Sequence, residues 1–289
     1  MTKWYLQFTK FHYYLIPIVC AVVWWGMLIA LLACWGAQGH PIYSFMKGKH
    51  QDPVYLSDIG ATNLQPLFIA CTGFQMIFFM GTLIMEYVLR KKHKLQPYVS
   101  TKQPKLAIAS IICGCIGEIG ILLVACFKTS KFKHVHFAMV GVFIAFVFFA
   151  CCFNFTLTFI FGNFPQRLHP NHEKVIFGKR RWANLYMVSF FLKIIWVIFA
   201  IVFAVAFGAL MNQGYKSASA VFEWIICYWY GFLLLIWSLD LFPSAVKSYR
   251  LHHPEKFDTE FIDNHKIPVE ARSSLEVKHN STSSSDIMS

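Results

Sequence analysis

The sequence predicts an all-α polytopic membrane protein with six transmembrane helices and both termini in the cytosol. Hydrophobic residues make up 57% of the 289 residues and charged residues only 14%, whereas soluble domains carry roughly 25% charged residues. The mean hydropathy is +0.50, which argues against a water-soluble globule. Six apolar runs are long enough to cross a bilayer, because a spanning helix needs about 20 residues. We place these spans at Tyr13–Trp35, Pro66–Leu89, Leu106–Phe127, Phe137–Phe161, Asn184–Leu210 and Ser219–Leu241.

Each of the first three runs carries a feature typical of a spanning helix. The first begins near Tyr13 and lacks a small-residue cleavage site, so we interpret it as a signal-anchor helix that stays in the protein. The second ends at a basic boundary, where Glu86 and Arg90 have the spacing of an i,i+4 ion pair. In the third, glycines spaced by three from Gly114 to Gly120 favour close approach of another helix.

The last three runs contain few polar residues, and each polar residue needs a partner inside a bilayer. The fourth run holds Asn154, for which we expect an interhelical hydrogen bond, as we do for Gln75 in the second. The fifth run carries Lys193. The sixth run contains Glu223 and Asp240, which are separated by a long aromatic and aliphatic stretch.

The distribution of positive charge orients the predicted spans. Nineteen Lys and Arg residues lie on the side of the two termini, and six lie on the other side. Basic residues concentrate on the cytosolic side of membrane proteins, so both termini are expected to be cytosolic. The same asymmetry explains the net charge of +12 without nucleic acid as a partner.

Two basic clusters on the expected cytosolic side allow two interpretations. They either set the topology alone or also bind anionic phospholipid, including phosphoinositide, because each Lys or Arg near anionic lipid is worth about 1 kcal/mol. The candidate lipid-binding face consists of Arg90, Lys91, Lys92, Lys94, Lys179, Arg180 and Arg181.

Two ionisable residues lie deep within the spans and are therefore candidate functional groups. Glu118 in the third span and Lys193 in the fifth are predicted to differ in depth by about one helical turn. We expect them to form an ion pair that fixes the register of two helices, or else a polar patch that handles a lipid head group or a proton.

The domain organisation follows from the spans. We expect a cytosolic N-terminus over residues 1–12, a six-helix transmembrane domain over 13–242 and a largely disordered cytosolic tail over 243–289. The tail ends in a serine-rich stretch that is typical of disorder and phosphorylation.

The chain carries no recognisable catalytic, metal-binding or phosphate-binding motif, so no metal and no cofactor is expected. Histidines of the expected outer face could approach Asp58 and Glu223, as a metal site or as an acid and base, although their spacing is irregular. These histidines are His40, His50, His134 and His136.

The segment from Ser57 to Gly60 has the composition of a turn, in which Asp58 accepts backbone hydrogen bonds and Gly60 takes a positive φ. We expect this segment to fold over the outer helix ends near Glu223 and Trp224.

Residues 10–250 resemble the Frag/DRAM/Sfk family of six-span proteins. The first outer loop carries a Ser-Asp-x-Gly motif at Ser57, Asp58 and Gly60, and the sixth span carries Glu223-Trp224 followed by Asp240-Leu241-Phe242. A histidine, His134 or His136, stands at the head of the fourth span. The amino-acid sequences of residues 38–45 and of the Ser-Asp-Ile-Gly-Ala segment are most similar to those of the fungal suppressor-of-four-kinase branch.

This resemblance implies a non-enzymatic membrane regulator with no settled catalytic residues. The fungal branch is linked to plasma-membrane phosphatidylinositol 4-kinase and to phospholipid and sterol organisation. The implied partners are membrane lipids, including anionic phospholipid, phosphoinositide or sterol, and a lipid-kinase complex on the cytosolic side.

Other branches imply two alternatives. One is GPI-anchor lipid remodelling in the Golgi or endoplasmic reticulum, with an outer site of Asp58, Glu223 and His136. The other is autophagy modulation at a lysosomal or vacuolar membrane. A transporter is a weaker alternative, because no inverted repeat or pair of broken helices is evident.

Overall fold

The computed structural model describes residues 12–46, 51–164, 167 and 184–252, with side chains up to residue 245. In these residues the chain forms seven α-helices, one short 3-10 helix and no strand. Six helices are long and apolar enough to cross a membrane, which confirms the six expected spans. They are α2 (Leu15–Ala37), α4 (Gln65–Lys91), α5 (Gln103–Cys126), α6 (Thr129–Asn163), α7 (Leu185–Asn212) and α8 (Lys216–His252). A first compact unit of the chain extends to Ala245.

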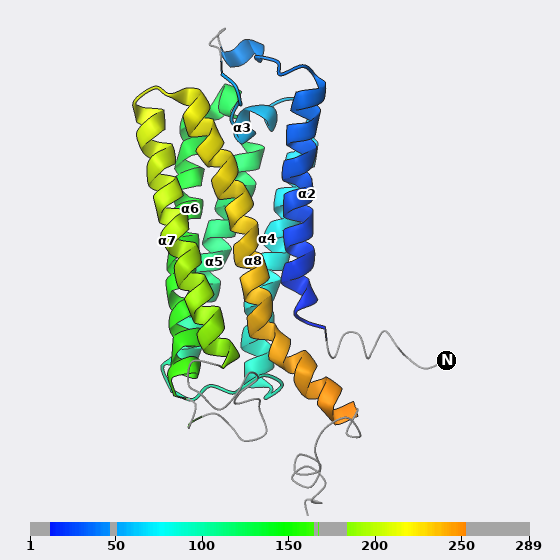
Figure 1. Ribbon diagram of the computed structural model, residues 1–289, viewed down its shortest axis with the longest axis vertical. Coiled ribbons are helices and arrows are strands. Elements are labelled where there is room, and N and C mark those ends of the chain that lie inside the picture. The colour runs from blue at the N-terminus through cyan, green and yellow to red at the C-terminus, as the bar shows by residue number, and fades with distance from the viewer. Residues whose placement is uncertain (1–11, 47–50, 165–166, 168–183, 253–289) are drawn as a thin grey trace, which may run out of the picture. The chain divides into compact units, whose positions relative to one another are not determined.

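Successive long helices run in opposite directions in this unit, so the bundle has two ends (Figure 1). We call one the α3 end, because it carries the single-turn helix α3 (Leu56–Ile59) and the 3-10 helix η1 (Ser44–Met46). At the other end, which we call the Arg90 end, α4 terminates and α5 begins. The sequence explains several helix termini: Pro66 occupies the first turn of α4, where its missing N–H has no cost, and the Asn184 side chain caps α7 by accepting from Met187 N at 2.9 Å.

Two helices extend far beyond the predicted runs, whereas the other bounds differ by at most three residues. Helix α6 begins at Thr129 rather than at Phe137, and its backbone departs from helical geometry at Phe132, so a polar first turn joins the apolar helix across a kink. Helix α8 continues past Leu241 and contains Pro243. Hydropathy marks only the apolar part of each helix, which is why both polar extensions fall outside the predicted runs.

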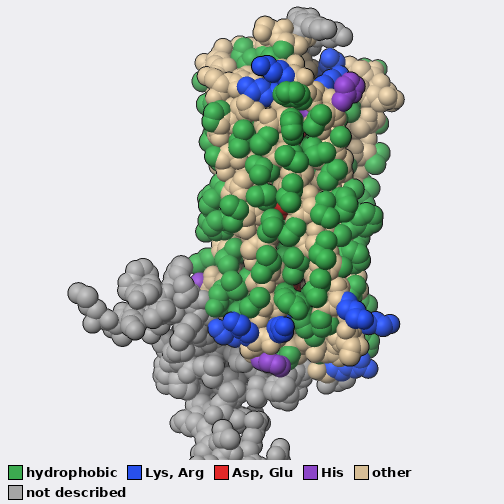
Figure 2. Space-filling model, turned by 180° about the vertical axis from the view of Figure 1, so that it is seen from behind, with side chains coloured by type: hydrophobic (Ala, Val, Ile, Leu, Met, Phe, Trp, Pro, Cys, Tyr) green, Lys and Arg blue, Asp and Glu red, His purple; other side chains and the backbone are tan. Residues whose placement is uncertain are grey.

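On the face shown in Figure 2, hydrophobic side chains cover the surface between the two ends, and lysine and arginine side chains gather at the ends. Val22, Ile77 and Val205 are 62%, 62% and 65% exposed. A soluble protein rarely exposes a continuous apolar surface of this kind, whereas a bilayer requires it. The chain is therefore a multi-pass membrane protein.

Helices α5 and α6 approach each other closely along the predicted glycine face. A Cβ atom on Gly117 would lie 3.0 Å from the backbone nitrogen of Val147, and one on Gly120 would lie 3.0 Å from that of Phe143. Ser110 adds a hydrogen bond from its Oγ to the Ala150 carbonyl at 2.8 Å. The expected close helix packing at these glycines is confirmed.

Tryptophan side chains connect α8 to its neighbours. Trp24 on α2 donates from Nε1 to the Cys227 carbonyl at 2.7 Å. Trp196 on α7 and Trp229 on α8 each donate from Nε1 to the other's backbone carbonyl, at 2.8 and 3.0 Å. Because a buried indole N–H needs an acceptor, these contacts fix the rotation of α8 and thereby the direction of its acidic side chains.

Candidate functional site

The loop before α4 folds onto the start of α8. Leu56 N donates to Glu223 Oε2 at 2.8 Å, and Trp224 Nε1 donates to the Val54 carbonyl at 3.0 Å. Both partners on α8 belong to the Glu223-Trp224 pair singled out in the sequence. The expectation that the segment from Ser57 to Gly60 lies over this helix end is confirmed.

The geometry of that segment differs from the expected turn. Gly60 has φ −63°, so the predicted positive φ is wrong. A glycine is needed for another reason: a Cβ there would lie 2.5 Å from the Phe68 ring. Asp58 does not serve mainly as a turn acceptor; its Oδ1 accepts from Thr129 Oγ1 at 3.2 Å and so connects α3 to α6. Burial raises the pKa of the Asp58 carboxyl above its ordinary value, while the Thr129 hydroxyl and the charges of Lys216 and Lys133 act in the opposite direction.

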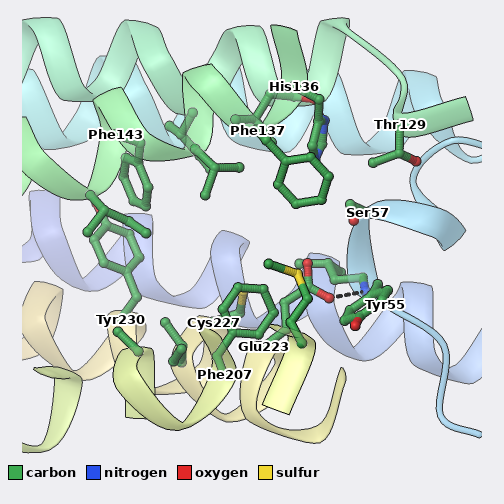
Figure 3. Close-up of a pocket in the computed structure, with 18 of the residues that line it drawn as sticks. Tyr55, Ser57, Thr129, His136, Phe137, Phe143, Phe207, Glu223, Cys227 and Tyr230 are labelled. Carbon is green, nitrogen blue, oxygen red and sulfur yellow. Dashed lines mark hydrogen bonds between the residues drawn. The ribbon is translucent and has the colours of Figure 1, made fainter. Parts of the chain in front are cut away.

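A cavity of about 780 Å³ begins beneath α3 and extends into the bundle between α6, α7 and α8 (Figure 3). At the α3 end its lining is polar, and deeper it is apolar. The polar lining includes Ser57, Asp58, Glu223, Lys133 and Lys216. The apolar lining includes Val140, Phe143, Val147, Val197 and Ala200. Volumes of this size are typical of small-molecule sites.

Tyr230 lies at the deep end of the cavity (Figure 3). Its hydroxyl donates to Glu118 Oε1 at 2.8 Å and accepts from Gln75 Nε2 at 2.6 Å. Glu118 therefore has a tyrosine as its partner, and the expected ion pair between Glu118 and Lys193 is wrong. The interhelical hydrogen bond expected of Gln75 is confirmed.

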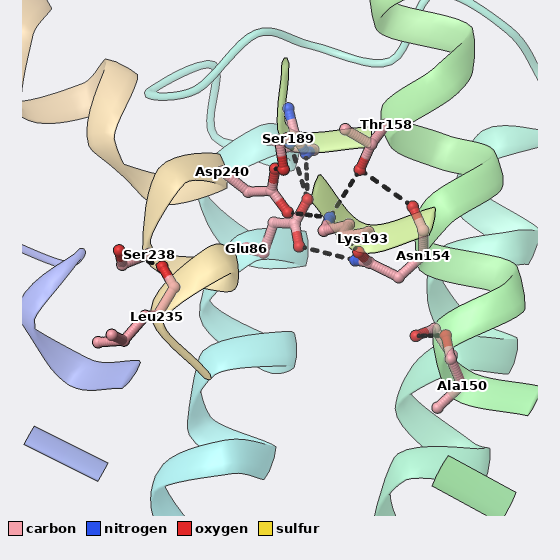
Figure 4. Close-up of polar contacts among 11 residues, drawn as sticks. Glu86, Ala150, Asn154, Thr158, Ser189, Lys193, Leu235, Ser238 and Asp240 are labelled. Atoms are coloured by element: carbon pink, nitrogen blue, oxygen red, sulfur yellow. Dashed lines mark hydrogen bonds and ion pairs between the residues drawn. The ribbon is translucent and has the colours of Figure 1, made fainter. Parts of the chain in front are cut away.

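Lys193 pairs with Asp240 on α8 (Figure 4). Its ammonium group also donates to Asn154 Oδ1 at 2.7 Å and to Thr158 Oγ1 at 2.9 Å. Asp240 Oδ1 accepts from Ser189 Oγ at 2.8 Å. Depth along the helices explains the choice of partner, because Lys193 and Asp240 both belong to the Arg90 half of their helices, whereas Glu118 lies further toward the α3 end.

A second ion pair adjoins the first. Arg90 donates to Glu86 Oε1 from Nη2 at 2.7 Å and from Nε at 3.0 Å, as the i,i+4 spacing predicts. Asn154 bridges the pairs, since its Nδ2 donates to Glu86 Oε2 at 3.1 Å while its Oδ1 accepts from Lys193. Two acids and two bases thus form one neutral cluster, which is how a membrane interior tolerates charge. This cluster is a structural feature of the bundle.

Arg90 belongs to this cluster and is only 2% exposed, so it is not part of a lipid-binding surface as the sequence suggested. Its guanidinium also lies 4.4 Å from the centre of the Phe161 ring. Lys91, Lys92 and Lys94 are exposed at the same end. Lys179, Arg180 and Arg181 lie outside the described residues.

The outer-face histidines are dispersed. His136 lines the cavity, but its Nδ1 lies 3.0 and 2.9 Å from the Val124 and Phe127 carbonyl oxygens, so Nδ1 carries the hydrogen. His40 Nδ1 lies 3.6 Å from Asp52, His134 is exposed, and His50 is outside the described residues. In the part of the chain that the structure describes, no group of three or more His, Cys, Asp or Glu side chains could hold a metal ion.

Comparison with known proteins gives one family and two curated relatives. The family model of the Frag1/DRAM/Sfk1/Cwh43P N-terminal domain matches residues 12–244. The SFK1 protein of Saccharomyces cerevisiae is 33% identical over 295 aligned positions, which cover 84% of this chain and 82% of that protein. The sfk1 protein of Schizosaccharomyces pombe is 26% identical over 239 positions, which cover 82% of this chain and 66% of that protein. No solved structure matches the chain significantly.

Proposed function

Because the chain belongs to the Frag1/DRAM/Sfk1/Cwh43P family, we propose that it is a non-enzymatic integral membrane regulator of the plasma membrane. Its role is to support phosphatidylinositol 4-kinase function and the organisation of phospholipid and sterol. The kinase link comes from the resemblance to the fungal suppressor-of-four-kinase branch. Membrane lipids and a lipid-kinase complex are the proposed partners.

The proposed orientation places the Arg90 end in the cytosol and the α3 end outside. Its support is the excess of Lys and Arg on the side of the termini. In this orientation the kinase, a cytosolic enzyme that acts on a membrane lipid, meets the Arg90 end.

The observation that carries the proposal is the exposure of Lys91, the last residue of α4, and of Lys92 and Lys94, which follow the helix directly. Their neighbour Arg90 forms an ion pair with Glu86 inside the bundle. This pair anchors the end of the helix, while the lysines that follow Arg90 remain free to bind lipid. Lysines near the membrane surface attract anionic lipid, and each contributes about 1 kcal/mol to the free energy of binding.

The test replaces Lys91 and Lys92 with glutamine. The matched control replaces Lys128 and Lys131, which lie at the α3 end. Losing about 2 kcal/mol weakens an anionic-lipid contact by roughly thirtyfold. In cells lacking the native protein, the first variant is expected to leave plasma-membrane phosphatidylinositol 4-phosphate low, and the control is expected to restore it. Full restoration by both variants, at equal surface abundance, would reject the proposal.

One observation favours lipid remodelling as a second candidate. Asp58, Glu223 and His136 all line the same cavity, as an acid–base site would require. Substituting Glu223 with glutamine would then abolish remodelling of GPI-anchor lipids, and a tagged copy would stain the Golgi or endoplasmic reticulum. Surface staining with normal anchor lipids favours the regulator.

A further inference from the structure

We propose that the cavity at the α3 end binds one zwitterionic phospholipid, with an acyl chain in its apolar part and the head group between the charged side chains beneath α3. This site goes beyond the proposed role at the Arg90 end and does not depend on it. Four features of the described residues support the assignment: cavity-lining side chains that are also exposed on the apolar surface, an apolar depth, paired opposite charges and an unsatisfied amide.

Several side chains that line the cavity are also exposed on the apolar surface of the bundle. Ile144 and Phe148 on α6 line it and are 48% and 40% exposed, and Ile201 on α7 lines it and is 49% exposed. These side chains belong at once to the cavity wall and to the apolar outer surface. The proposed entry route for the lipid is therefore between α6 and α7, directly from the membrane.

The depth of the cavity suits an acyl chain. We call the charged side chains that line the cavity at the α3 end its rim. Between this rim and Tyr230 the wall is built of aliphatic and aromatic side chains, and the Tyr230 hydroxyl at the deep end is already bonded to Glu118 and Gln75. Glu223 and Tyr230 are seven residues apart on α8, which corresponds to about 10 Å along the helix axis. The cavity thus extends through about a third of a hydrocarbon core that is roughly 30 Å thick.

Charge at the rim selects the head group. An acyl chain gains little by exchanging bilayer for cavity, because both are apolar, so the head group must provide the specificity. Asp58 and Glu223 offer two carboxyl groups, and Lys133 and Lys216 offer two ammonium groups. No ion pair joins these lysines to these acids within the described residues. A ligand with an ammonium group and a phosphate matches both signs at once.

An unsatisfied donor lies at the same rim. Gln51 lines the cavity and is 3% exposed, and its Nε2 has no hydrogen-bond partner among the described residues. A buried amide N–H without an acceptor is costly, so a missing acceptor is expected nearby. A phosphate oxygen held by Lys133 and Lys216 would supply one. Asp58 and Glu223 would then face the ammonium group.

The test reconstitutes the full-length protein into phosphatidylcholine vesicles that contain traces of acyl-chain photo-crosslinking phospholipids. The probes carry choline, ethanolamine or glycerol head groups, and a photoreactive cholesterol probe is a fourth. Crosslinked peptides are mapped by mass spectrometry. We expect the choline probe, the ethanolamine probe or both to label the cavity-lining parts of α6 and α7 at least tenfold more than the glycerol probe. Equal labelling by the glycerol probe, or preferential labelling by the sterol, would overturn the proposal.

Two substitutions on α7 locate the label. Ala204 lines the cavity, so Ala204→Phe should fill it and reduce labelling at least tenfold. Val205, the next residue, is 65% exposed and outside the cavity lining, so Val205→Phe should label as the wild type does. Unchanged labelling of a monodisperse Ala204→Phe protein would contradict the site, and the wild-type probe comparison decides the matter even where a variant fails to fold.

A double substitution at the rim tests the head-group preference. Asp58→Asn combined with Glu223→Gln should remove the preference over the glycerol probe, because both carboxyl groups that would face the ammonium group are then neutral. The amide oxygen introduced by Glu223→Gln can still accept the hydrogen bond from Leu56 N, so the loop can keep its attachment to α8. A full preference for the choline and ethanolamine probes in a correctly folded double variant would contradict the assigned head-group contacts.

Discussion

The Lys193 ammonium group is fully buried, and three side chains from two other helices account for its charge and its donors. Asp240 provides the opposite charge, while Asn154 and Thr158 accept hydrogen bonds. Removing one member of a buried ion pair leaves an uncompensated charge, at a cost of about 3–5 kcal/mol. Asp240→Asn and Lys193→Met should therefore each lower the melting temperature of the detergent-purified protein strongly.

The double variant separates pairing from simple damage. With both charges removed, the penalty of an isolated charge disappears, so Lys193→Met with Asp240→Asn should be more stable than either single variant. Glu118→Gln combined with Lys193→Met should instead show additive losses, because Glu118 bonds to Tyr230. Additive losses in the Lys193 and Asp240 pair would contradict the assignment.

Gly60 tests close packing at a single residue. An added methyl group would lie 2.5 Å from the Phe68 ring, so Gly60→Ala must displace the ring or α3 and is expected to cost about 1–3 kcal/mol. The control is Gly26→Ala on α2, where a Cβ would meet nothing within 4 Å. Thermal unfolding followed by tryptophan fluorescence compares the two, and equal melting temperatures would refute the packing argument.

At the scale of elements, α5 and α6 form a pair that depends on glycine. A Cβ on Gly120 would approach the backbone at Phe143 N and Met139 O, at 3.0 and 3.2 Å, and backbone atoms cannot move aside as a side chain can. Gly120→Ala should force the helices apart and lower the yield of folded protein. Gly141→Ala on α6, which meets nothing within 4 Å, should leave it unchanged. Size-exclusion profiles of the two variants provide the measurement, and matching profiles would contradict the prediction.

Helix α3 should hold to the bundle more weakly as the pH rises. Burial raises the pKa of Asp58 above its ordinary value of about 3.9. A raised acid pKa means that the folded state favours the neutral form, so this stabilisation is complete below the unfolded pKa and is lost as the pH rises through the folded pKa. Hydrogen exchange of residues 55–60 should therefore accelerate with pH more in the wild type than in Asp58→Asn, after correction for intrinsic rates. Glu223, Lys133 and Lys216 are common to both proteins, and identical pH profiles would show that Asp58 does not control the attachment.

At the scale of the whole molecule, the sequence predicts the helices much better than their contacts. Hydropathy identifies all six spans because each must satisfy its backbone internally and face lipid. The partner of Lys193 was not predictable from the residue spacing considered, since the depths predicted for Glu118 and Lys193 differ by only about one turn and spacing does not say which helices are neighbours. The cavity was not predictable either, because its polar and apolar lining residues come from segments far apart in the sequence, and only the tertiary packing brings them together.

The glycines show the same division between local and tertiary information. The spacing from Gly114 to Gly120 indicates a helix contact, and the contact forms. Gly60 was correctly singled out but for the wrong reason, because a composition typical of a turn suggests a positive φ, while the actual constraint is the Phe68 ring of α4. The local pattern identifies a residue whose identity is constrained, and the tertiary packing determines the physical cause of that constraint.

The most direct test of the whole account is the orientation of the bundle, because the proposed kinase contact requires the Arg90 end to face the cytosol. Epitope tags placed after Ser289 and between Lys47 and Lys49 are compared in intact and permeabilised cells. The prediction is that antibody reaches the Lys47–Lys49 tag in intact cells and the Ser289 tag only after permeabilisation. Staining of the Ser289 tag on intact cells would contradict the account, since the exposed lysines at the end of α4 would then face away from the proposed kinase partner.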